Sequence, residues 1–322
     1  MSIFNAIYRK LRFPFKFMRA AIKYPAANAR VKQYQVMSPD ETIDLLLKNK
    51  KLSICRFGDG ELEMTLYKNI GFQPFDERLS ARLKEILQRG VTGTGNCLIC
   101  MPDAYRSTKN MRSGSALFWF FHKSFFFRNY EPLLSKKYRY GNTSVTRPYH
   151  DYKDKSQAPI IFAKFKRLIA DQRLLIVEGS GTRLGLGNDL LDSARQVSRI
   201  TTLNRNAFSV YDSLYSAVSG AAKNYDLVLI SLGPTATLLA YDLSQQGIRA
   251  IDSGHIDIEY EWMRSAAKDK MRVEGKNVNE VGVLLNEGNS PTDEAYRQQI
   301  LFHVGGAPEV VVLPLRCLCQ FP

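Results

Sequence analysis

Beginning at residue 174, apolar segments typical of β-strands alternate with segments of helical periodicity. Each apolar segment ends in turn-forming residues such as Gly, Asn, Ser or Pro. Strands that alternate with helices of this length are typical of βαβ units, whose strands pair in parallel. The pattern predicts strands at 174–177, 198–203, 227–232 and 250–251, and helices at 185–195, 207–222, 236–246 and 257–267.

The preceding half of the chain fits the same pattern. It adds predicted strands at 52–57 and 98–101, with a helix at 76–89 between them. We therefore predict one α/β domain over residues 37–280, with a mainly parallel sheet and helices on both faces. An aromatic and basic insertion at about 105–152 is of the kind that shapes a second-substrate site. Residues 281–322 are predicted to form a C-terminal extension, with a helix-like segment at 292–303 and an apolar segment at 310–315, both peripheral.

Positive charge is concentrated at the N-terminus. The formal net charge is +14, and residues 1–36 contain no acid but the cations Arg9, Lys10, Arg12, Lys16, Arg19, Lys23, Arg30 and Lys32. Apolar residues recur there at helical spacing, so we predict a basic amphipathic arm that binds an anionic membrane surface. A basic helix packed on the protein and a nucleic-acid-binding arm are the alternatives. No apolar run reaches the roughly 18 residues that a spanning helix needs, so attachment would be peripheral.

The cysteines do not suggest a disulfide framework. The chain has Cys55, Cys97, Cys100, Cys317 and Cys319, an odd number in a long sequence. Cys97 and Cys100 lie in a predicted strand, where residues three apart point to opposite faces. This favours buried thiols over a zinc or redox site, and it predicts a reducing, cytoplasmic location.

Two carboxylates follow the first long strand, in Arg56-Phe-Gly-Asp-Gly-Glu61. If strand geometry continues through the turn, Asp59 and Glu61 project to the same side. Mg²⁺ and similar ions are typically held by one or two carboxylates together with phosphate oxygens and water. The pair therefore predicts a metal and phosphate site, the alternative being a solvated turn.

A glycine-rich turn, Glu178-Gly-Ser-Gly-Thr-Arg-Leu-Gly185, lies between a predicted strand and a predicted helix. Such turns attract phosphate, and Arg183 could pair with a diphosphate. Because Gly179-Ser-Gly181 is close to dinucleotide fingerprints, a nicotinamide-dependent oxidoreductase is the alternative interpretation. That fingerprint expects an acid at the end of the next strand, where this chain has Leu203-Asn204-Arg205.

Two later turns carry further candidates. Gly233-Pro-Thr235 opens a helix, whose N-terminus attracts an anion or a sugar hydroxyl. Gly254-His-Ile-Asp-Ile-Glu-Tyr-Glu261 places a histidine beside three acids, which favours metal ligation or proton transfer over a purely structural histidine. Carboxyl ends of parallel strands meet at one edge of a sheet, so these turns are expected to line one crevice.

Taken together, the motifs resemble the bacterial glycosyltransferases of the GT-D fold. The resemblance covers about residues 37–280. It rests on the segments Arg56–Glu61, Val177–Leu190, Asn204–Phe208, Gly233–Thr237 and Gly254–Trp262, and Thr146-Arg-Pro-Tyr149 fits a further family segment.

The resemblance implies a Rossmann-like fold and transfer of a sugar, glucose or another hexose, from a UDP-sugar with Mn²⁺ or Mg²⁺. The acceptor would be a glycan in bacterial surface polysaccharide, lipopolysaccharide or glycoprotein assembly. With the basic arm, it would be lipid-linked at the inner face of the cell membrane, and no nucleic acid would be bound. Asp59 and Glu61 would hold the metal, and His255, Asp257 and Glu259 would be catalytic. The nucleotide-sugar would contact Arg56, Arg147, Glu178, Gly179, Arg183, Asn188, Asn206, Gly233, Pro234 and Thr235.

Overall fold

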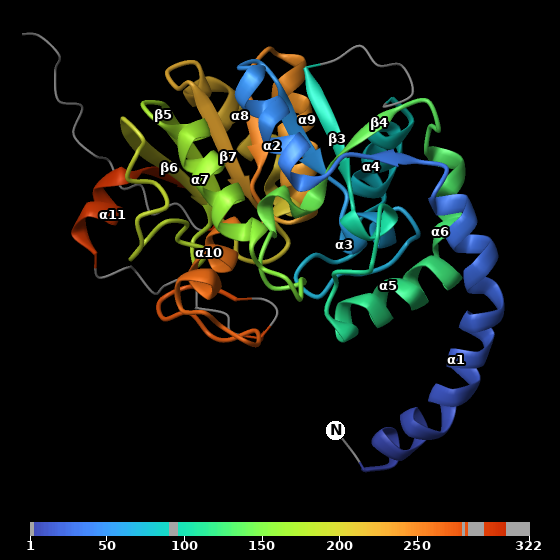
Figure 1. Ribbon diagram of the computed structural model, residues 1–322. Helices are drawn as coiled ribbons and strands as arrows, with labels where there is room; N and C mark the ends of the chain where they lie inside the picture. Colours follow the sequence, from blue (N-terminus) through green and yellow to red (C-terminus); the bar gives the residue numbers. More distant parts are fainter. Residues whose placement is uncertain (1–2, 90–95, 279–280, 283–292, 307–322) are drawn as a thin grey trace, which may run out of the picture.

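A computed structural model describes residues 3–89, 96–278, 281–282 and 293–306, with side chains from residue 13 onward. Its centre is a nine-stranded sheet in the order β1-β4-β3-β2-β8-β7-β5-β6-β9, in which neighbouring strands pair in parallel (Figure 1). The strands are β1 (Gln35–Val36), β2 (Ser53–Arg56), β3 (Cys97–Met101), β4 (Arg139–Asn142), β5 (Arg173–Gly179), β6 (Gln196–Thr202), β7 (Leu227–Ser231), β8 (Ala250–Asp252) and β9 (Ile300–Val304).

Helices connect the strands. The α-helices are α1 (Ile3–Val31), α2 (Pro39–Lys48), α3 (Asp59–Met64), α4 (Glu77–Arg89), α5 (Ser113–Phe125), α6 (Phe127–Tyr130), α7 (Gln157–Ile169), α8 (Tyr211–Ala222), α9 (Pro234–Gln245), α10 (Ile256–Arg264) and α11 (Glu294–Gln299). Four short 3₁₀ segments are η1 (Asp103–Tyr105), η2 (Glu131–Leu133), η3 (Thr143–Thr146) and η4 (Ala207–Val210).

Both faces of the sheet are covered, as the α/β prediction requires. Helices α4, α8 and α9 bury their apolar residues in a core on one face, and α2, α7 and α10 do so on the other. Strands β3 and β7 are buried along their whole length, which explains why their sequences are continuously apolar. The predicted fold class, with helices on both faces of a parallel sheet, is confirmed.

The helix predicted at 185–195 is wrong, because these residues form a series of turns. Gly185 and Gly187 have positive φ angles of 79° and 75°, which no α-helix contains. Two backbone amides at the start of this region pair with side-chain carboxylates. Leu184 donates to Glu178 and Gly185 donates to Asp257, at 2.8 and 2.9 Å.

The sheet extends beyond both predicted domain boundaries. Strand β1 precedes residue 37, and β9, which lies in the predicted C-terminal extension, pairs with β6 at the sheet edge. The predicted helix at 292–303 is a short helix followed by this strand, so the segment belongs to the domain and is not peripheral. The apolar segment 310–315 lies outside the described residues.

The N-terminal arm forms helix α1, which lies along α5 at the edge of the domain (Figure 1). Among the described residues, no helix combines the length and the hydropathy that a bilayer-spanning segment needs. Cys55, Cys97 and Cys100 are buried free thiols, and Cys97 and Cys100 lie in the cores on opposite faces of the sheet, as predicted. Cys317 and Cys319 lie outside the described residues.

Candidate active site

A cavity of about 1060 Å³ opens at the carboxyl ends of the strands. Segments that follow β2, β3, β4, β5, β6, β7 and β8 all contribute to its lining, together with α5 and with Asp269, Lys270, Asn277 and Val281. The turns singled out in the sequence therefore meet in one crevice, as expected for a parallel sheet. Of the proposed site residues, those in the lining are Arg56, Asp59, Glu61, Arg147, Gly179, Asn206, Gly233, His255 and Asp257.

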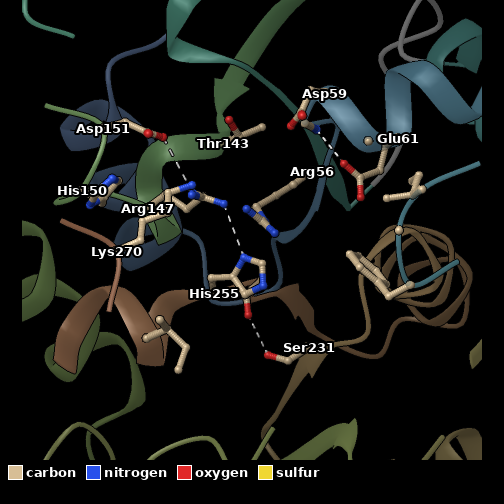
Figure 2. A pocket seen from close by; sticks show the side chains of 18 of the residues that line it. Arg56, Asp59, Glu61, Thr143, Arg147, His150, Asp151, Ser231, His255 and Lys270 are labelled. Carbon is tan, nitrogen blue, oxygen red and sulfur yellow. Dashed lines mark hydrogen bonds and ion pairs between the residues drawn. The ribbon is translucent and has the colours of Figure 1, made fainter. Parts of the chain in front are cut away.

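Asp59 and Glu61 reach the cavity by a geometry that the sequence analysis did not predict. Strand β2 ends at Arg56, and Asp59 is the first residue of helix α3. Residues two apart on a helix do not face each other, so the strand geometry assumed for the pair is wrong, although both side chains lie at the cavity (Figure 2). Glu61 folds back to accept the Gly58 amide at 2.9 Å, which caps the helix.

The two carboxylates differ in environment. Asp59 is exposed, and no hydrogen bond or ion pair engages it within the described residues. Burial, together with the charge of Asp252, raises the pKa of Glu61 to about 7. A cation would stabilise the ionised form of such a carboxylate.

Asp59 and Glu61 can hold a divalent ion only if substrate phosphates and water complete its coordination shell. Among the described residues, no group of three or more His, Cys, Asp or Glu side chains is arranged to hold a metal. Mg²⁺ and Mn²⁺ sites of the nucleotide-binding kind use one or two carboxylates, with substrate phosphates and water. Asp59 and Glu61 supply hard oxygen ligands of this type at the cavity wall.

Arg56 is held in place by Asp252 at the end of β8. Its Nε and Nη2 atoms donate to Asp252 Oδ1 at 3.1 Å each, while Thr237 donates to Oδ2 at 3.0 Å. Burial raises the pKa of Asp252 although the Arg56 guanidinium opposes the shift. Gly254 makes this arrangement possible, since a Cβ there would lie 1.8 Å from Arg56 Nη2.

A second arginine, Arg147, lies near Arg56 and His255 at the cavity (Figure 2). Arg147, just after η3, approaches His255 Nδ1 at 3.4 Å, and Figure 2 shows Arg56, Arg147 and His255 converging on the cavity. The Nε atom of Arg147 lies 3.8 Å from carboxylate oxygens of both Asp151 and Glu259. Burial opposes ionisation of Asp151, but Arg147 and a hydrogen bond from Ser115 outweigh it and lower the pKa of Asp151.

Two of the three predicted catalytic residues have structural roles. Glu259 is fully buried outside the cavity lining, where it accepts the amides of Tyr149 and His150 at 2.9 and 2.8 Å. Asp257 borders the cavity but is almost fully buried, and Gly185, Asn188 and Lys276 all donate to it. Both carboxylates therefore position neighbouring loops, and His255, which lines the cavity beside Arg147, is the remaining predicted catalytic residue.

Glu178, Arg183 and Asn188 also lie outside the cavity lining. Glu178 is fully buried, with Arg199 at 2.6 Å and Tyr296 at 2.9 Å. Arg183 donates to the carbonyl of Gly275, and Asn188 donates to Asp257 and Glu261. These residues support the cavity from behind, so their predicted contact with a nucleotide-sugar is not supported by their placement.

Of the remaining predicted positions, some line the cavity and others are buried beside it. Gly233 has a φ of 56°, and a Cβ there would lie 2.3 Å from the Phe72 ring, so glycine lets this ring approach the cavity wall. Pro234 and Thr235 are buried in the first turn of α9 and do not line the cavity. Asn206, in the left-handed region at φ 52°, does line it.

The sequence analysis missed several lining residues. Asp151 closely follows the Thr146-Arg-Pro-Tyr149 motif and could have been found by extending it. Phe118 and Trp119 lie in the insertion, where aromatic residues gave no periodic signal of a site. The others include Phe72, Arg112, Thr143, Asn204, Ser231 and Lys270.

Comparisons with known proteins agree with one another. A family model described as the glycosyltransferase GT-D fold matches residues 54–281. The chain is 38% identical over 288 residues to a probable glycosyl transferase, Gly, of Streptococcus gordonii, covering 89% of this chain and 41% of that protein. It is 37% identical over 270 residues to glycosyltransferase GlyD of Streptococcus pneumoniae serotype 4, covering 84% and 32%. The chain thus spans less than half the length of these relatives.

Solved structures show the same fold. One, described as domain of unknown function 1792 with a distinct glycosyltransferase fold, superposes with a TM-score of 0.80 at 34% identity, covering 87% of this chain and 99% of that one. Another, a glycosyltransferase of the same domain type from Streptococcus sanguinis, has a TM-score of 0.78 at 38% identity, covering 84% and 100%.

Proposed function

The chain belongs to the GT-D glycosyltransferase family, and on that premise we propose that it transfers a hexose from a UDP-sugar to a glycan acceptor with the aid of a divalent metal. One observation carries the proposal. The cavity combines the arginines Arg56 and Arg147 with the carboxylates Asp59 and Glu61 at the carboxyl ends of parallel strands. Cationic groups for a diphosphate and oxygen ligands for a metal are thus present in one place.

The chemistry needs stabilisation of the charge that develops on the departing UDP. Arg147 is oriented by Asp151 and Glu259, and Arg56 by Asp252, so neither guanidinium must be reorganised during the reaction. Asp59 and Glu61 would hold the metal, which when bound would add positive charge beside the diphosphate. His255 contacts Arg147 and lines the same cavity, where it can donate to the phosphates or to the sugar.

The oxidoreductase alternative lacks the elements that its fingerprint requires. A dinucleotide fingerprint places a helix N-terminus directly after the glycine turn. In this structure Gly179-Ser-Gly181 leads into turns, and β6 is followed by Leu203 and Asn204 in place of a ribose-binding acid. The relatives and neighbours are described as glycosyltransferases or as having that fold, so no comparison favours this alternative.

A paired experiment tests the proposal. Calorimetric titration with UDP and MnCl₂ is compared with titration with NADP, and hydrolysis of UDP-glucose, UDP-galactose and UDP-N-acetylglucosamine is then measured. We expect binding of UDP with Mn²⁺ only, turnover of one sugar, and loss of turnover on chelation with EDTA.

A substitution then tests the metal ligands. Asp59→Asn should reduce turnover at least about a hundredfold without changing the unfolding temperature. Glu85→Gln, an exposed carboxylate on α4, is the matched control and should remain fully active. A fully active Asp59→Asn variant, or tight binding of NADP without UDP binding, would contradict the proposal.

A further inference from the structure

The exposed apolar side chains of this protein are gathered on two adjacent helices. Of the eleven large hydrophobic residues exposed in the described part of the chain, seven lie on α1 or α5. They are Phe13, Phe15, Phe17, Met18, Ile22, Leu117 and Phe118. Such clustering on a soluble surface marks an interaction site, whereas single exposed residues do not.

One apolar face of helix α1 packs against α5. Phe13 and Phe17 contact the aromatic rings of α5, with Phe17 and Phe120 centroids 5.3 Å apart. Further along, Tyr24 packs on Phe120 at 4.9 Å, and Ala20 accepts a hydrogen bond from Ser124. These contacts fix α1 on α5, so the helix is part of the folded domain and its outer face has a defined direction.

The outer face of α1 is a second apolar stripe. Phe15, Met18 and Ile22 are 67%, 55% and 74% exposed. At 3.6 residues per turn they fall within an arc of roughly 60°, on the side away from α5. Arg19 and Lys23 flank this stripe at the next positions around the helix, and both are exposed. An apolar stripe bordered by cations is the pattern of a helix that lies in a membrane interface.

The positive charge of this surface favours an anionic membrane over a second copy of the chain as its partner. Residues 1–36 carry eight cations and no acid, so a second copy of the same surface would be repelled. An anionic bilayer is complementary both to the cations and to the apolar stripe. In Figure 1, α1 runs along the edge of the domain, and its N-terminal turns extend beyond the body, where a flat surface can reach them.

Helix α5 connects this surface to the cavity. Gly114, Ser115, Phe118 and Trp119 line the cavity, while the rings of Phe120 and Phe121 on the same helix pack against α1. Phe118 is 43% exposed and therefore belongs both to the cavity rim and to the apolar surface. Helix α5 thus has the cavity on one side and α1 on the other.

We propose that the outer face of α1, formed by Phe15, Met18 and Ile22 with Arg19 and Lys23 along one side, docks on an anionic membrane. This docking is independent of the proposed reaction.

Vesicle flotation of the full chain tests the docking. The protein should float with phosphatidylcholine vesicles that contain phosphatidylglycerol, and not with phosphatidylcholine alone. Substituting both Arg19 and Lys23 by Gln should lower the partition coefficient roughly 25-fold, from about fivefold per cation. The triple variant Phe15→Ser, Met18→Ser, Ile22→Ser should lower it at least about a hundredfold.

The control is Ile160→Ser, which removes an exposed apolar side chain, 45% exposed, from α7. It should bind vesicles like the unmodified protein. Absence of binding to anionic vesicles, or equal binding by the triple variant, would overturn the proposal. A dimer in solution that the triple variant converts to a monomer would also overturn it, because the surface would then be a self-association interface.

Calorimetry with UDP separates the two proposals, since the triple variant should keep its UDP affinity even though it no longer floats.

Discussion

Substitution of Gly254 by Ala tests how Arg56 is held at the cavity. Gly254 has a φ of 49°, and an added Cβ would lie 1.8 Å from Arg56 Nη2. A long arginine side chain normally moves away from such a contact, but here three hydrogen bonds tie it to Asp252. The methyl group must therefore displace the guanidinium and leave Asp252, 1% exposed, without its cation.

The expected loss in the free energy of unfolding has two parts. A left-handed backbone costs a residue with a Cβ roughly 1–2 kcal/mol. Loss of one partner from a buried ion pair costs about 3–5 kcal/mol, and the lower end applies because Thr237 still donates to Asp252. We expect Gly254→Ala to lower the free energy of unfolding by about 4–5 kcal/mol in urea denaturation.

Gly247→Ala is the matched control, because Gly247 has a φ of 77° and nothing within 4 Å of its added Cβ. Its free energy of unfolding should fall by only about 1–2 kcal/mol, which is the cost of the left-handed backbone alone. In the background of Arg56→Met, where the ion pair is already absent, Gly254→Ala should cost little more than this control. Equal losses in the two glycine variants, or fully additive losses with Arg56→Met, would refute the reasoning.

Three further outcomes are expected. Glu178→Ala should lower the free energy of unfolding by about 3–5 kcal/mol, because it leaves the buried Arg199 without its carboxylate partner. Tyr296→Phe, which removes one hydrogen bond to Glu178, should lower it by only about 1 kcal/mol. Similar losses for the two variants in urea denaturation would contradict this. Burial raises the pKa of Glu259 to about 6, so the folded state binds its proton more tightly than the unfolded state, and this contribution is lost as pH rises through 6. Relative to the unmodified protein, Glu259→Gln should therefore gain about 2 kcal/mol between pH 4 and pH 7, and a pH-independent difference would disprove the assignment. Arg147→Lys keeps the charge but loses the planar fork, so UDP should bind about tenfold more weakly by calorimetry, and unchanged affinity would exclude a diphosphate contact.

The sequence predicted the sheet well because its strands are buried on both faces. Strands such as β7 are continuously apolar and followed by turn residues, so both their existence and the edge at which their turns meet could be inferred. The segment 185–195 shows the limit of this reasoning. The Gly185 amide is paired with Asp257, and no local pattern reveals a partner 72 residues away.

The site shows the same limit. The motif residues 254–261 were located correctly, but their roles depend on distant groups. Lys276 makes Asp257 a structural carboxylate, and the amides of Tyr149 and His150 do the same for Glu259. A motif predicts which segments come together at a site, whereas the division between lining residues and supporting residues is set by tertiary packing.

The strand order has a consequence for how this protein is made. Strands β1 to β4 form one half of the sheet and β5 to β9 the other, and the halves join where Ile54 of β2 pairs with Ile251 of β8. After Asn142 completes the first half, about 110 further residues must therefore be synthesised before β8 can cover its central edge. The Arg56–Asp252 pair spans the same seam, so the cavity is completed by one of the last pairings to become possible in the nascent chain.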